Sequence, residues 1–228
     1  MVDHLPARPI RQLSTPRAAA AAGVLFALFF GTALILIRTA LPEGAEPGSQ
    51  WLDVDGTRIK VASVLIPFAG IAFLWFIGVV RDGFGQYEDR FFSSVFLGSG
   101  LLFLAMTFTA SAVGAGLVAS NIASDAVGDP AANAGAVFRQ TLMLALGNTF
   151  ALRMAAVFMI SLATIWLKTG LMSRWLVVTT YLVALGLLIT SDLSMWITLA
   201  FPIWVLVVSL LLLVKSGVID WHHEQEAG

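Results

Sequence analysis

Long apolar runs without a charged residue alternate along this chain with short polar segments, and this alternation is its dominant pattern. Most runs reach the length of about 20 residues that an α-helix needs to cross the hydrocarbon core of a bilayer. The runs cover residues 18–37, 61–80, 91–118, 142–167, 175–190 and 195–214. The pattern therefore predicts an all-α integral membrane protein, folded as a bundle of six transmembrane helices.

The composition agrees with this fold class. Hydrophobic residues make up 58% of the 228 residues and charged residues only 12%, whereas a soluble domain carries about 25% charged residues. Arg8, Arg11 and Arg17 precede the first run as in a secretory signal, but the length of that run fits an uncleaved span better. We therefore expect tails at 1–17 and 216–228 around a single transmembrane domain at 18–215.

The basic residues indicate the orientation of the bundle. With the N-terminus in the cytoplasm, the cytoplasmic segments carry eight Lys or Arg residues and the outer segments carry four. The positive-inside rule favours this N-in/C-in arrangement. The cytoplasmic set is Arg8, Arg11, Arg17, Arg81, Arg90, Lys168, Arg174 and Lys215, and the outer set is Arg38, Arg58, Lys60 and Arg139.

The outer loop between the first two helices has a pattern of its own. Residues 51–61 partly alternate between apolar and polar about the pair Asp55-Gly56, which is typical of a tight hairpin turn. We therefore expect a small β-hairpin-like outer loop at this place.

The third run carries small residues on one helical face. Close packing of small side chains is what holds helices together in lipid. At about 100° per residue, the face is formed by Ser94, Gly98, Ala105, Thr109, Ala112, Gly116 and Ala119. We therefore expect the third helix to lie at the centre of the bundle.

Several kinds of chemistry lack the residues that they need. The chain has no cysteine, and its three histidines, His4, His222 and His223, lie in the predicted tails. The spans therefore hold no thiolate, no pair of haem ligands and no histidine base. All acidic residues also lie outside the spans, which disfavours a proton-coupled carrier. We expect no enzymatic activity, no cofactor and no metal site.

Arg153 is the ionisable residue that lies well inside a predicted span. A charge there is costly unless it is paired, is solvated or reaches the interface. Arg153 could extend toward the outer interface beside Asn148, or it could form a buried ion pair or an anion site. Asp192, at the outer end of the fifth span, is the acidic residue nearest to a span, and we expect it to pair with Arg153.

The cytoplasmic loop between the second and third spans is a second candidate site. Its charges, carried by Arg81, Asp82, Glu88, Asp89 and Arg90, alternate in sign over a glycine-containing turn. This pattern indicates an ordered, salt-bridged clamp.

Parts of the chain resemble known groups of membrane proteins. Gly78, Asp82 and Gly85 match the spacing of a loop in major facilitator carriers, but Gly83, Gln86 and Tyr87 replace its basic positions, so this resemblance to half of such a carrier is weak. Residues 67–82, 88–92, 168–175 and 201–204 together resemble an uncharacterised family of bacterial multipass proteins, a domain of unknown function. That resemblance implies a multi-pass protein of the bacterial plasma membrane and brings no activity, substrate or site residues.

The sequence leaves two functional hypotheses. The first is a non-enzymatic structural or accessory subunit that works through helix packing. The alternative is a small oligomeric transporter or channel with a polar site at Arg153. The expected partners are the lipid bilayer and either further copies of the chain or another membrane protein. The net charge of −1 gives no reason to expect nucleic acid.

Overall fold

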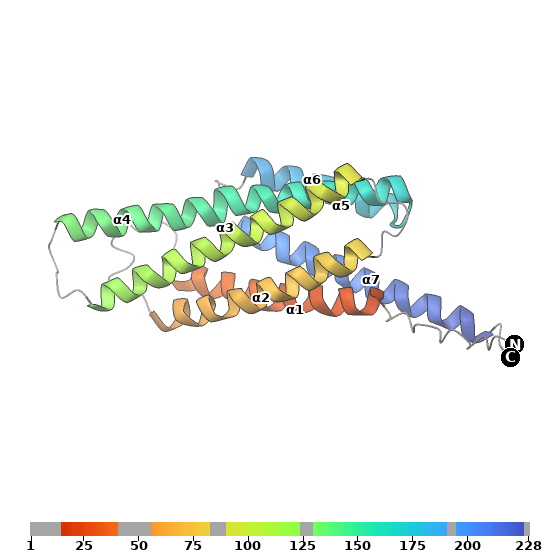
Figure 1. Ribbon diagram of the computed structural model, residues 1–228, viewed down its shortest axis with the longest axis horizontal. Helices are drawn as coiled ribbons and strands as arrows, with labels where there is room; N and C mark the ends of the chain where they lie inside the picture. Colours follow the sequence, from red (N-terminus) through yellow and green to blue (C-terminus); the bar gives the residue numbers. More distant parts are fainter. Residues whose placement is uncertain (1–14, 41–55, 83–89, 124–129, 191–194, 226–228) are drawn as a thin grey trace, which may run out of the picture.

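The computed structural model describes residues 15–40, 56–82, 90–123, 130–190 and 195–225, and all regular structure there is helical (Figure 1). The elements are α1 (Thr15–Ala40), α2 (Gly56–Asp82), α3 (Arg90–Ala123), α4 (Pro130–Leu144), the π-helix η3 (Ala145–Ala151), α5 (Leu152–Thr169), α6 (Arg174–Thr190), the 3-10 helix η4 (Met195–Leu199) and α7 (Ala200–Gln225). Within these ranges, five helical stretches are long and apolar enough to cross a membrane, and α6 is a shorter apolar helix. The prediction of an all-helical, apolar multi-pass chain is confirmed, while a crossing by α6 stays a prediction.

α4, η3 and α5 follow one another without a break and form one long helix (Figure 1). The predicted fourth span starts only at residue 142, because Arg139 and Gln140 interrupt the apolar run there. The helix nevertheless begins at Pro130, whose fixed φ suits the first helical turn. Its N-terminal part therefore extends beyond the predicted span.

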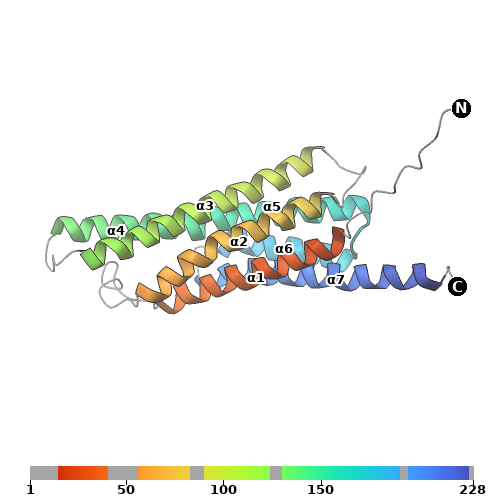
Figure 2. The same ribbon diagram turned by 60° about the horizontal axis from the view of Figure 1, so that its bottom comes forward.

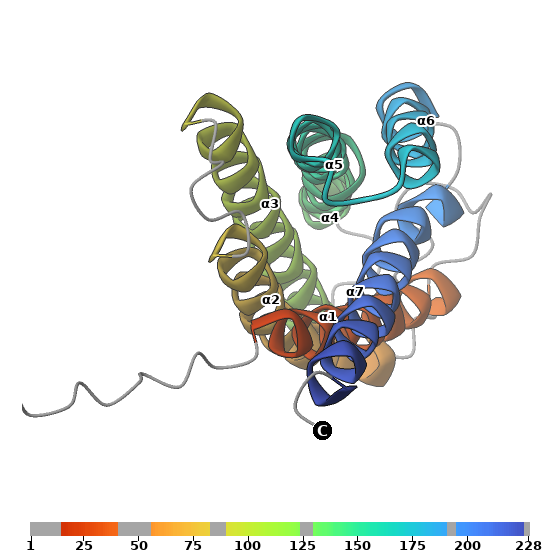
Figure 3. The ribbon, with the colours of Figure 1, turned by 90° about the vertical axis from the view of Figure 1, so that its right-hand side faces the viewer.

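The helices form a curved row in the order α7, α1, α2, α3, α5 and α6, which bends back so that α5 and α6 also touch α7 (Figures 2 and 3). α1 packs along both α2 and α7, and α3 packs along α2 and α5. The two ends of the row thus come together, and buried side chains from all six of these helices fill the space between them.

Phenylalanine rings are the largest fully buried side chains in this space. Phe73 on α2 is fully buried and has ring contacts with Phe26, Phe76, Phe103, Phe158 and Phe201. The ring centroids of Phe26 and Phe73 lie 4.6 Å apart and those of Phe96 and Phe158 lie 4.5 Å apart, within the range in which aromatic pairs attract. This aromatic cluster ties together α1, α2, α3, α5 and α7.

The most enclosed span is the one that contains α5, so the expectation that α3 lies at the centre is wrong. In the span Val137–Thr169, 61% of the most apolar window is buried, against 39% in the span of α3. Alanines at positions 151, 155, 156 and 163 are buried on this helix. They allow neighbouring helices to approach from several sides, as small residues do in membranes.

The small-residue face of α3 points away from the bundle. Ala105, Thr109, Ala112, Gly116 and Ala119 are exposed, and a Cβ added at Gly98 or Gly116 would meet nothing within 4 Å. The buried face of α3 instead follows two series with a spacing of seven residues. One series is Ser93, Gly100, Thr107 and Gly114, and the other is Phe96, Phe103, Ala110 and Leu117. A repeat of seven is the period of helices that pack side by side, and it selects a different face from the one that small residues alone suggest.

The expected β-hairpin is not confirmed. Gly56 to Val61, which would form its second strand, make up the start of α2 instead, and residues 51–55 lie outside the described part of the chain. The helix therefore begins ahead of the predicted span and includes the polar residues Thr57, Arg58 and Lys60. At the other end of the chain, α7 continues to Gln225, so much of the predicted C-terminal tail is helical.

The orientation can be tested with reporters fused after Gly228 and inserted in the turn 191–194. We expect the first to report the cytoplasmic side and the second the outer side, because α7 would cross the membrane between them. Paired phosphatase and fluorescent-protein fusions provide the measurement. If both positions report the same side, α7 does not cross the membrane and the arrangement with six spans is wrong.

Candidate functional site

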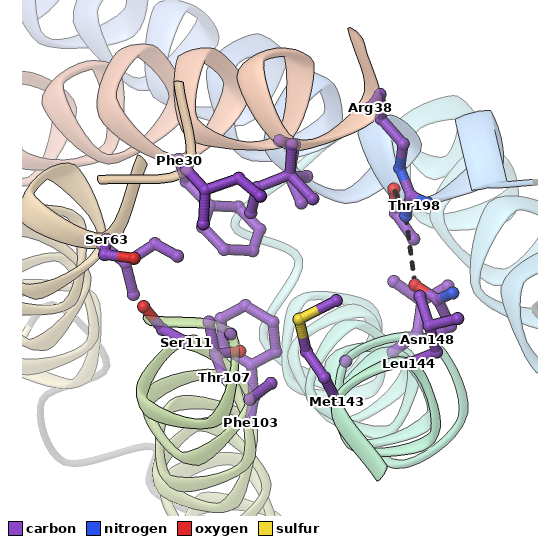
Figure 4. Close-up of a pocket in the computed structure, with 18 residues that line it drawn as sticks. Phe30, Arg38, Ser63, Phe103, Thr107, Ser111, Met143, Leu144, Asn148 and Thr198 are labelled. Atoms are coloured by element: carbon purple, nitrogen blue, oxygen red, sulfur yellow. Dashed lines mark hydrogen bonds between the residues drawn. The ribbon is translucent and has the colours of Figure 1, made fainter. Parts of the chain in front are cut away.

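A cavity of about 80 Å³ lies toward the end of the bundle at which α1 ends and α2 begins (Figure 4). One water needs about 10–15 Å³ measured in this way, so the cavity has room for several waters or a small organic molecule. It lies between α1 and α2 on one side and α3, α4 and η3 on the other. Its lining is Phe30, Leu34, Ile37, Arg38, Ile59, Ser63, Ile66, Phe103, Thr107, Ala110, Ser111, Gly114, Met143, Leu144, Gly147, Asn148, Leu152 and Thr198.

Arg38 is the charged residue of this lining. It lies in the last turn of α1 and is only 7% exposed. Its Nη2 donates hydrogen bonds to Asn148 Oδ1 and to Thr198 Oγ1, both at 3.1 Å (Figure 4). Three separate elements, α1, η3 and η4, therefore fix the guanidinium group in the cavity wall. A group held in this way loses little further freedom when it binds a ligand.

The two residues that hold Arg38 lie in helical segments with unusual geometry. Asn148 is in the π-helix η3, and short π segments are frequent at functional sites because they change which side chains share a face. Thr198 is in the tighter 3-10 helix η4, just before α7. Pro202 lies in the first turn of α7, where its missing N–H removes no helical hydrogen bond. The change from 3-10 helix to α-helix therefore falls just before this proline.

The opposite side of the cavity carries three hydroxyl groups, from Ser63 on α2 and from Thr107 and Ser111 on α3 (Figure 4). Thr107 is only 8% exposed. Within the described part of the chain, none of the three hydroxyls forms a hydrogen bond. A hydroxyl group can both donate and accept a hydrogen bond, so these three groups can bind a water or a ligand in the cavity.

The remaining walls are apolar. The rings of Phe30 and Phe103 line the cavity and lie 5.5 Å apart in an edge-to-face arrangement. Phe103 also contacts Phe73 and Phe201 in the aromatic cluster. The cavity is therefore bounded by that cluster on the side toward the other end of the bundle.

The predicted site residues have different outcomes. Asn148 does belong to a polar site, but its partner is Arg38. Arg153 is half-buried on α5 and does not line the cavity. Arg81 and Asp82 are exposed at the far end of α2. The structure places only the backbone of Arg90, at the start of α3. Glu88, Asp89 and Asp192 lie outside the described residues. The pairing expected between Asp192 and Arg153 therefore stays a prediction.

Arg38 is a site residue that the sequence analysis did not select. Because Arg38 directly follows the first apolar run, its position is typical of a solvated charge at the end of a span. The helix in fact continues to Ala40. No signal in the sequence distinguishes Arg38 from a solvated arginine at the end of a span. Its partners Asn148 and Thr198 are 110 and 160 residues away, and only the fold brings them together.

Among the described residues, no group of three or more His, Cys, Asp or Glu could hold a metal ion. Comparison of the chain with protein-family models, with curated proteins and with solved structures finds no match. The site therefore has to be interpreted from its own geometry.

Proposed function

We propose that this chain is a non-enzymatic multi-pass membrane protein that binds a small molecule in the cavity beside Arg38. The observation that carries the proposal is the buried arginine, held by Asn148 and Thr198 in the wall of a cavity of about 80 Å³. Ligand sites typically combine apolar walls with a few well-placed polar groups. A buried charge inside a membrane protein is costly and is therefore a sign of function.

The position of the cavity supports a binding site that opens toward one side. The aromatic cluster around Phe73 lies between the cavity and the opposite end of the bundle, so the cavity does not continue as a pore through it. With the N-terminus in the cytoplasm, the end of α1 lies at the outer face. The ligand would then enter from outside the cell or from the outer leaflet of the membrane.

A cavity-filling substitution tests this function. Gly147 lines the cavity, and a Cβ added there would meet only Ala110 Cβ, at 3.9 Å, which is an ordinary contact. In Gly147→Leu the rest of the new side chain would occupy the cavity. We expect a member of a series of equal size (benzoate, benzamide, benzyl alcohol, benzylamine) to raise the Tm of the wild-type protein in nanodiscs. At about ten times its Kd the rise should be a few degrees, and it should be absent in Gly147→Leu.

Gly98→Leu is the matched control, because a Cβ at Gly98 meets nothing within 4 Å and Gly98 does not line the cavity. This variant should respond to the ligand as the wild-type protein does. A series in which no compound shifts the Tm of the wild-type protein, or in which Gly147→Leu responds equally, would contradict a ligand-binding role.

A structural or accessory subunit is the second candidate. The outward small-residue face of α3, free of contacts at Gly98 and Gly116 within the protomer, favours it because a helix of another protein could approach closely there. Purification from native membranes in a mild detergent tests this role. A stoichiometric partner that is lost in Gly116→Leu would favour it, and a protein that purifies alone would not.

A further inference from the structure

We propose that the ligand of this cavity is a small neutral molecule, with an apolar body against Phe30 and Phe103 and one alcohol-like group bound by the hydroxyls of α2 and α3. The inference rests on the proposed binding function and adds the chemical class of the ligand. It follows from the hydroxyls in the cavity wall, from the neutral character of the lining around them, and from the apolar surface that separates them from Arg38.

Three hydroxyl groups form the polar part of the wall on the side of α2 and α3. Ser63 lies on α2, while Thr107 and Ser111 lie four residues apart on α3 and so share one face of that helix. Within the described part of the chain none of the three forms a hydrogen bond. By contrast, Ser99 and Thr109 on α3 each donate to the carbonyl oxygen four residues back. The hydroxyls of the cavity therefore keep their donors and acceptors for a molecule inside it.

These groups fit a ligand that both donates and accepts hydrogen bonds. A hydroxyl group has one donor and two acceptor lone pairs. An alcohol or a primary amide in the cavity can accept from one hydroxyl, such as that of Thr107, and donate to another. Because Thr107 is only 8% exposed, such a bond would be sheltered from competing water, and this favours a directed contact over a loose one.

The lining around the hydroxyls favours a neutral ligand. Apart from Arg38, no described residue of the lining is ionisable. Arg38 is engaged by the protein itself, through its bonds to Asn148 and Thr198 and through a further interaction, and the proposal gives it no part in holding the ligand. An ionised ligand would lose its hydration on entering and would meet neutral groups beside the hydroxyls. Burying a charge in this way costs far more than burying a neutral polar group that finds a hydrogen bond.

The centre of the cavity defines the body of the ligand. Phe30, Phe103 and Met143 lie between the hydroxyls on one side and Arg38 on the other (Figure 4). The two rings stand edge to face, with their centroids 5.5 Å apart. An apolar body would cover this surface and release the water in contact with it. The ligand is thus amphiphilic, with its polar end toward α2 and α3.

The first experiment compares ligands of similar size that differ in their head group. Binding of benzyl alcohol, benzamide, benzoate and benzylamine to the whole protein in nanodiscs is measured by titration calorimetry and by the shift in Tm. We expect the two neutral compounds to bind about tenfold or more tightly than the two charged ones. Gly147→Leu in the same nanodiscs should abolish the binding of all four, and it gives the background from partition into lipid.

The second experiment removes single hydroxyls from the wall. Thr107→Val keeps the shape of the side chain, so it should weaken the binding of benzyl alcohol about 2- to 10-fold, the effect of one hydrogen bond. It should not weaken the binding of ethylbenzene, which has a methyl group in place of the hydroxyl. Ser111→Ala is a second variant of the same kind. Thr109→Val is the matched control on α3, because Thr109 is exposed and does not line the cavity, and it should bind both compounds as the wild-type protein does.

The outcomes separate the ligand class from the binding function. If benzoate or benzylamine binds most tightly while Gly147→Leu still blocks it, the cavity binds ligands but the neutral class is wrong. If Thr107→Val and Ser111→Ala both bind benzyl alcohol as tightly as the wild-type protein does, the hydroxyls do not hold the ligand and the inference is likewise wrong. If no compound of the series binds, both the class and the proposed function are wrong.

Discussion

Replacing Phe73 by alanine is expected to destabilise the bundle by about 2–3 kcal/mol. Phe73 is fully buried and has ring contacts with five other phenylalanines, on α1, α2, α3, α5 and α7. Lipid is as apolar as the protein interior, so the loss comes mainly from the cavity that the ring leaves. At about 24 cal/mol per Å³, roughly 100 Å³ of lost volume gives this magnitude.

Trp75→Ala is the matched control on the same helix. Trp75 is 70% exposed and therefore faces lipid in the proposed arrangement, so its removal should change the free energy of unfolding by about 0.5 kcal/mol or less. Unfolding in mixed detergent micelles with increasing dodecyl sulfate, followed by far-UV circular dichroism, gives both values. Equal losses for the two variants would mean that Phe73 does not connect the helices as described.

The positions of the spans could be predicted from the sequence because the bilayer imposes one simple requirement. A segment that crosses it must be apolar over about 20 residues and must satisfy its own backbone hydrogen bonds. The predicted run 61–80 accordingly lies within α2 (Gly56–Asp82), and the run 91–118 lies within α3 (Arg90–Ala123). The ends of the helices could not be predicted in this way, because Gly56 to Lys60 and Pro130 to Thr141 extend the helices with polar residues.

The buried face of α3 illustrates why the packing could not be predicted. In a membrane protein both the buried face and the lipid-facing face of a helix can be apolar. The distribution of hydrophobic residues therefore does not indicate which face is buried. Two small-residue stripes run along α3, and the sequence does not say which of them meets a neighbour. Phe96 and Phe103, spaced by seven residues on the buried side, were the better guide, since their rings fit the aromatic cluster.

The polar site depends on contacts that are far apart in the chain. Asn148 could be selected as a candidate because it is a polar neighbour of Arg153 in the same predicted span. Its partner Arg38 could not be selected, because the sequence around Arg38 is that of any arginine at the end of a span. The contact also depends on η3, since a regular α-helix from Pro130 to Thr169 would carry Asn148 on a different face. The sequence pattern shows no feature that separates a π segment from the α-helix around it.

A pair of glycines on α3 tests which face of this helix is buried. A Cβ added at Gly100 would lie 2.7 Å from Ile77 Cδ1 and 3.2 Å from Phe158 Cδ2, closer than carbon atoms approach without displacement. Gly100→Leu must therefore displace the side chains of Ile77 and Phe158, and we expect a loss of stability of about 1–3 kcal/mol or failure to fold. The measurement is the same dodecyl sulfate titration, with the smaller variant Gly100→Ala as an intermediate step that should lose less.

Gly98→Leu, two residues away, provides the comparison, because a Cβ at that position meets nothing within 4 Å. The variant should be as stable as the wild-type protein or slightly more stable, since leucine is a better helix former than glycine by about 0.5–1 kcal/mol. A large loss of stability in Gly98→Leu together with none in Gly100→Leu would mean that the original expectation was right and that α3 is turned the other way. A loss in both would mean that the outward face of α3 is covered in the membrane by another helix, and the oligomeric state of Gly98→Leu in the same detergent would then show whether that helix comes from a second copy.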